Sequence, residues 1–152
     1  MWRNAHDTYL EDRVLSAGPV ELVHLLYQTC ITSLGDARHH LAEGRILERA
    51  RSISKACAIL VELTTALDHE RGGELSGRLA QLYDYMHRRL IDANFRQSDA
   101  ALAEVAGLLA TLQEGWEELM QDSRRQERTE TAWVPAMGQE PEMAHASSSW
   151  SF

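Results

Sequence analysis

Residues 75–94 read LSGRLAQLYDYMHRRLIDAN, and this stretch decides the fold class. Its apolar residues recur at steps of four, three, four, four and three, which places them on one side of an α-helix and excludes a β-strand. The residues of this stripe are Leu75, Leu79, Leu82, Met86, Leu90 and Ala93. A break at Gly72 and Gly73 precedes the stretch. We therefore expect one long amphipathic helix here.

Three other stretches carry the same period. Pro19 suits the first position of a helix over residues 19–42, with Gly18 before it as an acceptable N-cap. Glu43 and Gly44 end that helix, and Ser98 is a good N-cap for a last helix in which Asp99 faces the positive end of the helix dipole. The expected stripes are Val23, Tyr27, Cys30, Leu34, Ala37 and Leu41; Ile46, Ala50, Ile53, Cys57, Leu60, Thr64 and Leu67; and Leu102, Val105, Leu109, Leu112, Trp116 and Leu119.

Connections of about two to six residues cannot carry the chain back along a helix, so successive helices must lie side by side and antiparallel. The sequence thus predicts an all-α protein, an up-down-up-down four-helix bundle over residues 19–122. Residues 1–18 lack sustained helical order and form an N-terminal arm. Residues 123–152 are rich in Pro, Ser, Glu and Gln, which predicts a disordered C-terminal tail. A short docking motif of Trp133, Val134, Trp150 and Phe152 is an alternative to the solvated tail that the composition favours.

Composition restricts the partners. The net charge of −8 and the lack of a basic stripe argue against nucleic-acid binding and against an anionic membrane surface. The sequence has no apolar run long enough for stable membrane insertion and no secretory signal at its N-terminus, so we expect the protein in the cytoplasm. Cys30 and Cys57 fall on apolar stripes, where we expect reduced thiols.

Signatures of catalysis are absent, which predicts a protein that is not an enzyme and needs no cofactor. His39 with Glu43, and the run from Asp68 to Glu70, do not converge three ligands on one point, so no metal site is expected. A histidine-phosphotransfer module is also a four-helix bundle and remains an alternative. The histidines that its helices would offer are His24, His39, His40 and His87.

Apolar residues outside the expected stripes widen the helix faces. They are Leu22, Leu26, Ile31, Ile59, Leu63, Tyr83, Tyr85, Ile91 and Phe95. A broad core accounts for about half of such residues in a globular bundle. The others predict exposed grooves between helices, which are the means by which a bundle captures an amphipathic segment.

Several short motifs stand in the same order as in a known family. They are PVELV with LY at 26–27, LDHERGG at 67–73, LYDYM with RRL at 82–90, AN at 93–94 and Trp116. Over residues 5–120 the chain resembles the FliS family of flagellin-specific export chaperones. The sequence departs from the family at His6, where an aromatic residue is common, and at Gly18, where a serine is common.

The resemblance implies an antiparallel bundle that holds flagellin in the cytoplasm. It implies two partners, the disordered C-terminal segment of flagellin and the cytoplasmic domain of an FlhA-like export gate. Covering that segment would prevent premature polymerisation. Binding would be coupled to folding of the client, which covers much area at modest affinity and so permits release.

The resemblance also implies roles for particular residues. Tyr9, Val14 and Leu15 would form a mobile cover on the bundle, although plain N-terminal packing explains Val14 and Leu15 equally well. Three tyrosines would line the grooves, and three polar residues would hydrogen-bond the backbone of the client. For Arg88 and Arg89, an ion pair with Asp84 or Asp92 is an equal alternative. These six positions are Tyr27, Tyr83 and Tyr85, and Arg88, Arg89 and Asn94.

Overall fold

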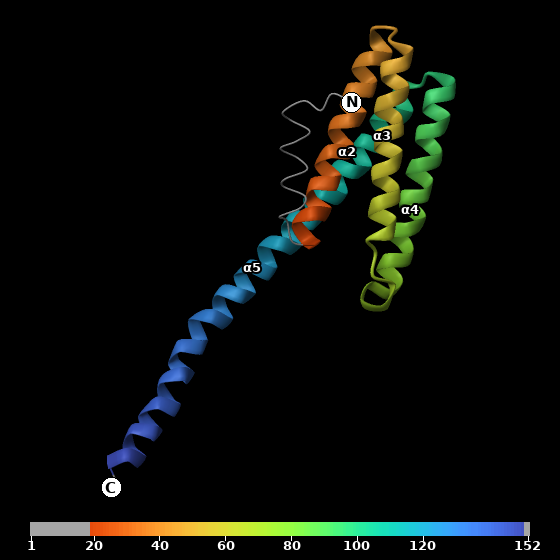
Figure 1. The fold of residues 1–152 in the computed structure, drawn as a ribbon. Coiled ribbons are helices and arrows are strands. Elements are labelled where there is room, and N and C mark those ends of the chain that lie inside the picture. Colours follow the sequence, from red (N-terminus) through yellow and green to blue (C-terminus); the bar gives the residue numbers. More distant parts are fainter. Residues whose placement is uncertain (1–18, 151–152) are drawn as a thin grey trace, which may run out of the picture. The chain divides into compact units, whose positions relative to one another are not determined.

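The computed structural model describes residues 19–150, with side chains for residues 20–132. The chain there forms four helices, α2 (Pro19–Ala42), α3 (Ile46–Thr65), α4 (His69–Arg96) and α5 (Asp99–Trp150), as Figure 1 shows. The described residues contain no strand, so the predicted all-α class is confirmed. The chain divides into two compact units, and the boundary lies inside α5, between Glu114 and Gly115.

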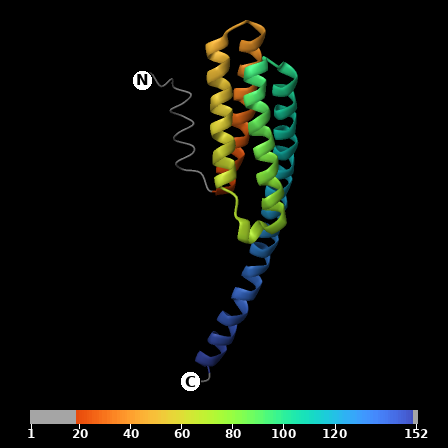
Figure 2. The same ribbon diagram turned by 90° about the vertical axis from the view of Figure 1, so that its right-hand side faces the viewer.

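The first unit is the four-helix bundle. Figure 2 shows α2, α3, α4 and the first part of α5 lying side by side and alternating in direction. The connections are only residues 43–45, 66–68 and 97–98, too short to return the chain along a helix. The antiparallel bundle that the sequence predicts is therefore the observed one.

Local signals explain where the helices begin and end. Gly44 has a φ of 71° and Gln97 a φ of 55°, left-handed conformations that stop α2 and α4. Ser98 Oγ accepts a hydrogen bond from the backbone N–H of Ala101 at 3.2 Å, which confirms the predicted N-cap of α5. Asp99 lies in the first turn of α5. Its carboxylate forms an ion pair with Arg38 of α2, with 2.8 Å between Arg38 Nε and Asp99 Oδ1.

Helix α4 begins earlier than the sequence suggests. Asp68 caps it by accepting from the backbone N–H groups of Glu70 and Arg71, at 3.1 and 3.0 Å. Gly73 lies inside the helix at φ 49° and ψ −121°, a conformation that residues with a Cβ rarely adopt. A Cβ on Gly72 would lie 1.9 Å from Ser76 Oγ. The two glycines therefore mark a kink within α4 and not the end of a connection.

The core runs along the facing sides of the four helices. Its buried apolar residues include Tyr27, Cys30 and Leu34 in α2, Ile53, Leu60 and Leu63 in α3, Met86, Leu90 and Ala93 in α4, and Leu102, Val105 and Leu109 in α5. Most of them belong to the expected stripes. Each side chain of this size contributes about 1.5–3 kcal/mol on burial, before the opposing chain entropy.

Four stripe assignments are wrong, and one of them is Thr64, which is exposed. Ile46 is 63% exposed and Leu75 is 60% exposed, so neither belongs to the core. Leu119, in the second unit, is 57% exposed. In α3 the buried face is rotated from the expected stripe, because Arg49, Ala56, Ile59 and Leu63 are buried in addition to Ile53 and Leu60. The α3 helix packs against both α2 and α4, and this second neighbour selects its buried face.

The two cysteines are free thiols, as predicted. Cys30 is buried and its Sγ donates to the carbonyl oxygen of Ala56 at 3.7 Å, which joins α2 to α3. Burial, with a smaller effect of the nearby Cys57, raises the pKa of Cys30 to about 12. A thiol with that pKa stays protonated at neutral pH and acts as a small core residue.

The second unit holds the remainder of α5, to Trp150. All side chains at positions 121–132 are exposed. A helical segment whose side chains are all exposed, as at 121–132, gains nothing from packing and is marginal in water. Farther along, Pro135 and Pro141 each lack a backbone donor. The disordered tail over residues 123–152 therefore stays a prediction, and its backbone is helical as far as Trp150 in the structure.

Candidate binding surface

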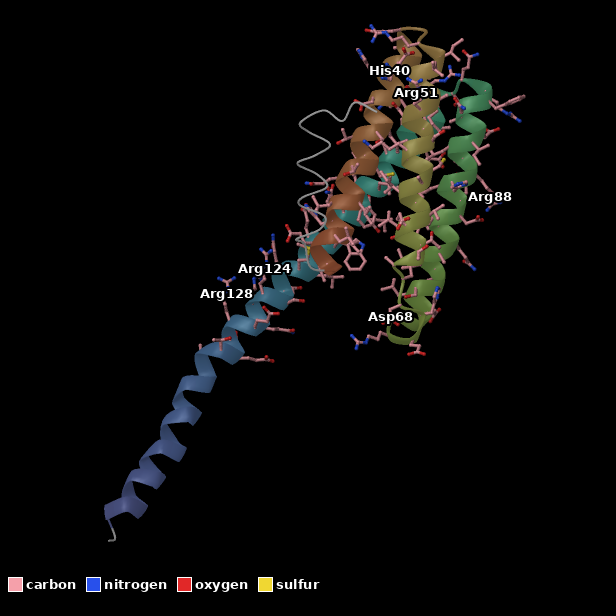
Figure 3. All side chains as sticks on the ribbon, in the orientation of Figure 1. His40, Arg51, Asp68, Arg88, Arg124 and Arg128 are labelled. Atoms are coloured by element: carbon pink, nitrogen blue, oxygen red, sulfur yellow. The ribbon has the colours of Figure 1, made fainter. Side chains whose placement is uncertain are left out.

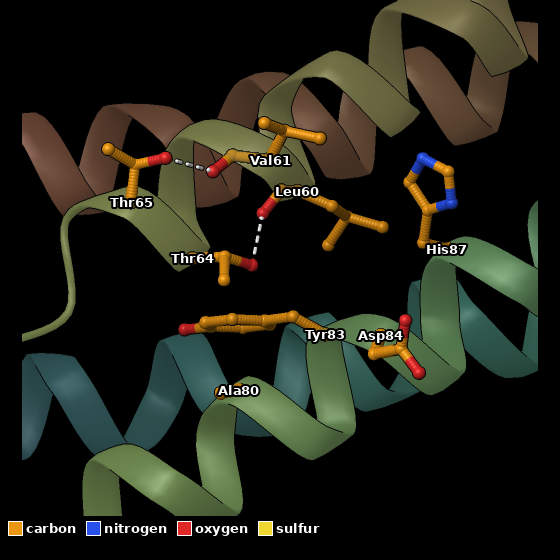
Figure 4. Close-up of a pocket in the computed structure, with 8 residues that line it drawn as sticks. All are labelled: Leu60, Val61, Thr64, Thr65, Ala80, Tyr83, Asp84 and His87. Carbon is orange, nitrogen blue, oxygen red and sulfur yellow. Dashed lines mark hydrogen bonds between the residues drawn. The ribbon is translucent and has the colours of Figure 1, made fainter.

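A groove of about 300 Å³ lies between α3 and α4. Figure 4 shows its lining, which α3 supplies from two successive turns and α4 from the turns that face them. The lining residues are Leu60, Val61, Thr64, Thr65, Ala80, Tyr83, Asp84 and His87. Thr64 and Thr65 donate their hydroxyls to the carbonyls of Leu60 and Val61, at 2.8 and 2.9 Å. The hydroxyl protons of the two threonines are therefore used within α3, and Asp84 and His87 are the other polar side chains of the lining.

Tyr83 forms the floor of this groove, with its ring lying across it in Figure 4. Its hydroxyl is hydrogen-bonded to that of Tyr27 in α2, and the two ring centroids are 6.5 Å apart at 55°. Burial is the main cause that raises the pKa of Tyr83, and the bond to Tyr27 adds to it. Tyr83 thus gives a ring face to the groove while its polar end is held in the core. Tyr27 is fully buried, so any effect it has on a partner passes through Tyr83.

Exposed apolar residues gather on these same two helices. Of the large apolar side chains exposed in the described bundle, most lie on α3 or on the later turns of α4. They are Ile46, Leu47, Val61, Ile91 and Phe95, which we call the outer apolar residues. Phe95 is 85% exposed, the highest among them. The sequence pointed to Ile91 and Phe95, whereas Ile46 was assigned to the core and Leu47 and Val61 carried no distinguishing signal.

Arg88 stands at the edge of the groove. Figure 3 shows it on the outer side of α4, and its Nε lies 3.1 Å from Oδ2 of the groove residue Asp84. Both side chains are about two-thirds exposed. Such an exposed ion pair contributes little to stability, so Arg88 or Asp84 can give it up at small cost and bind a group of another molecule instead. The ion pair with Asp84, one of the two alternatives for Arg88, is present.

Tyr85 and Arg89 lie on the other side of α4, next to α5. The Tyr85 hydroxyl donates to Glu104 Oε1, and Arg89 lies 2.8 Å from Glu104 Oε2 through Nη2 and 3.6 Å from Asp92 Oδ2 through Nη1. We call Tyr85, Arg89 and Glu104 the α4–α5 clasp. The hydrogen bond from Tyr85, followed by that from Arg89, lowers the pKa of Glu104. Tyr85 and Arg89, both predicted to bind a partner, are therefore bonded to Glu104 inside the bundle.

Asn94 is held by a residue that the sequence did not single out. Arg49 of α3 is only 6% exposed and donates to Asn94 twice, from Nε to Oδ1 at 3.2 Å and from Nη2 to the backbone oxygen at 3.4 Å. Asn94 itself is half-buried, on α4. The sequence did contain a signal for Arg49. This residue precedes Ile53 by four positions, which places an arginine on the apolar face of that helix.

The arm residues Tyr9, Val14 and Leu15 lie outside the described residues. Within the described part, no group of three or more His, Cys, Asp or Glu side chains is placed to hold a metal ion. No helix among the described residues is both long and apolar enough to cross a membrane.

Within the described residues, the geometry therefore defines a helical bundle with an open groove between α3 and α4 and exposed apolar residues on the same two helices, a combination on which an amphipathic segment of another protein can dock.

Comparison with known proteins identifies the family. The family model described as "Flagellar protein FliS" matches residues 2–123. The chain is 38% identical over 119 residues to the flagellar secretion chaperone FliS of Salmonella typhimurium, covering 78% of this chain and 88% of that protein. It is 41% identical over 108 residues to the flagellar secretion chaperone FliSB of Pseudomonas aeruginosa, covering 71% and 86% of the two chains. The FliS of Bacillus subtilis is 31% identical over 123 residues.

This chain belongs to the FliS family of flagellar secretion chaperones.

Proposed function

We propose that this protein is a cytoplasmic, non-enzymatic chaperone of flagellin. It binds the disordered C-terminal segment of flagellin, prevents premature polymerisation and delivers its client to the cytoplasmic domain of an FlhA-like export gate. Membership of a family of flagellar secretion chaperones supports this proposal.

The observation that carries the proposal is the open face between α3 and α4. Five large apolar side chains of α3 and α4 are more than half exposed, and one of them, Val61, lines a groove of about 300 Å³. Exposed apolar residues that gather on one face mark an interaction site more often than a plain surface. An amphipathic segment places apolar side chains at intervals of three and four, which suits a groove that runs between two helices.

A disordered client fits this surface energetically. Ordering the client on binding opposes the gain from apolar burial, so a large contact area yields an affinity that still allows release. No nucleotide is needed for such a step. Tyr83 contacts the client through the groove, and Tyr27 supports Tyr83 from below. Arg88 and Asn94 bond its backbone, while Tyr85 and Arg89 contribute only where the α4–α5 clasp opens. Tyr9, Val14 and Leu15 form the mobile cover.

Isothermal titration with a synthetic peptide of the flagellin C-terminal segment from the same organism tests the proposal. We expect a one-to-one complex with a negative heat-capacity change, because apolar surface is buried. Val61→Asp places a charge in the groove and should weaken binding about tenfold or more.

The chain offers a matched control for that variant. Val20 of α2 is 50% exposed, close to the 52% of Val61, and does not line the groove. Val20→Asp should therefore leave the affinity within a factor of about two. Equal losses in the two variants would mean that the charge acts through the whole surface and not at the groove. Absence of heat with both the peptide and full-length flagellin would overturn the proposed function.

A further inference from the structure

Arg49 is an unusual core residue. It is 6% exposed, and within the described chain the hydrogen bonds of its side chain go only to Asn94, with no ion pair to a carboxylate. A buried cation is costly unless its charge is compensated. The carbonyl of Asn94 is one of the last four of α4, which ends at Arg96 and leaves those groups without helical partners. The guanidinium therefore sits at the negative end of the α4 dipole, and this explains how its burial is tolerated.

The contact also determines how the Asn94 amide is turned. The Arg49 Nε–H group can only donate, so the amide must present its oxygen to Arg49 at 3.2 Å. The amide nitrogen Nδ2 consequently points away from Arg49. Nδ2 has no hydrogen-bond partner among the residues whose side chains are described, and the atom is not fully enclosed by the protein. The two N–H groups of the Asn94 amide thus have no partner in that part of the chain, and the residue is partly exposed.

These donors lie on the open face. His87, Ile91 and Asn94 follow one another at steps of four and three, so they share one side of α4, and His87 lines the groove. On α3, the exposed residue Ile46 precedes Arg49 by one turn. Apolar neighbours reduce the competition of water for a hydrogen bond at this place.

We propose that Arg49 is a positioning residue, which locks the Asn94 amide so that Nδ2 donates to a main-chain carbonyl of an extended stretch of the client. This inference rests on the proposed function. Extended chain has carbonyls with no partner of their own, and each needs a donor when it is covered. An amide already held in place loses less entropy on binding than a free one. A hydrogen-bonding point at Asn94, about two turns beyond the groove residue His87, would set where the bound chain leaves the groove.

The variant Asn94→Asp separates this role from a structural one. The carboxylate still accepts the Arg49 Nε bond and the backbone oxygen keeps the Nη2 bond, so we expect a melting temperature equal to or above that of the wild type. Where the amide donated, the variant presents an oxygen that repels a carbonyl. We expect titration with the flagellin C-terminal peptide to show a loss of affinity of about tenfold. Gln97→Glu adds the same charge one turn away and should bind within a factor of about two.

A double-mutant cycle tests the part played by Arg49. In an Arg49→Met background the amide is free to turn, so Asn94→Asp should cost less than about threefold. Arg49→Lys is the second background, because it keeps the cation at the helix end but cannot hold the amide in a planar fork. Folding of each variant is checked by circular dichroism.

The outcomes are distinct. Binding of Asn94→Asp within a factor of about two of the wild type overturns the hydrogen-bonding point. The same loss from Asn94→Asp in all three backgrounds overturns the positioning role of Arg49. If the wild-type chain forms no complex, the proposed function fails and this inference falls with it.

Discussion

The two sides of α4 are closed in different ways. Toward α5, Tyr85 and Arg89 bond Glu104 in the α4–α5 clasp. Toward α3, the side-chain hydrogen bonds among the described residues are those of Arg49 to Asn94, and farther along the two helices lies the groove with Val61 in solvent. A polar clasp fixes the spacing of two helices at small cost in apolar area. The α3 side instead keeps apolar surface uncovered, which only a partner can bury.

Two tyrosines show the same contrast within one turn. Tyr83 and Tyr85 are two positions apart, so they point to different sides of the helix. Tyr83 is 2% exposed and holds the floor of the groove, whereas Tyr85 is 38% exposed and holds the clasp. We therefore expect the same substitution to act on folding at one position and far less at the other.

The largest effect is expected for Tyr83→Ala. Removing a buried aromatic ring leaves a cavity and costs about 3–5 kcal/mol of unfolding free energy. Urea denaturation followed by circular dichroism measures this loss. Tyr85→Ala is the matched control and should lose much less, because the ring is partly in solvent. Similar losses at the two positions would contradict the contrast between the sides of α4.

A smaller effect, on binding alone, is expected for Phe95→Glu. The side chain is 85% exposed, so the bundle loses no packing and its melting temperature should hardly change. If the client buries this ring, the lost burial is worth about 1.5–3 kcal/mol, a factor of about 10–100 in the dissociation constant for flagellin. Leu75→Glu, at 60% exposure near the kink of α4, is the control. Wild-type affinity in Phe95→Glu would exclude this end of α4 from the interface.

The smallest effect is expected for the pH dependence of the clasp. The bonds from Tyr85 and Arg89 lower the pKa of Glu104 below its ordinary value of 4.5. A carboxylate with a lowered pKa in the folded state adds stability above its unfolded pKa, and this addition is lost as the pH falls through the folded pKa. The wild type should therefore lose slightly more stability than Glu104→Gln between about pH 5 and pH 3.

Thermal melting across that pH range measures the difference. Glu62→Gln removes an exposed charge from α3 and serves as the control for general charge effects. Parallel curves for the wild type and Glu104→Gln would mean that the clasp does not depend on the ionised carboxylate.

The four helices were predictable because their signals are local. Pro19 begins α2, Gly44 ends the turn after it, and Ser98 caps α5, each through the backbone geometry of its own neighbourhood. The period of the apolar residues then requires a shared core. Ile91 and Phe95 stood outside that period, and the structure leaves both exposed. The sequence by itself thus determined the fold class, the order of the helices and part of the open face.

Only the tertiary structure decided how each helix is rotated and which residues pair across the bundle. Ile46 follows the helical period yet lies in solvent, since α3 turns its buried face between two neighbours. Tyr27 meets Tyr83 across 56 positions of the chain, and Arg49 meets Asn94 across 45. Spacing along one helix shows which residues share a face, but it carries no information on what another helix places opposite. That choice comes from packing all four helices together, which brings distant residues into contact.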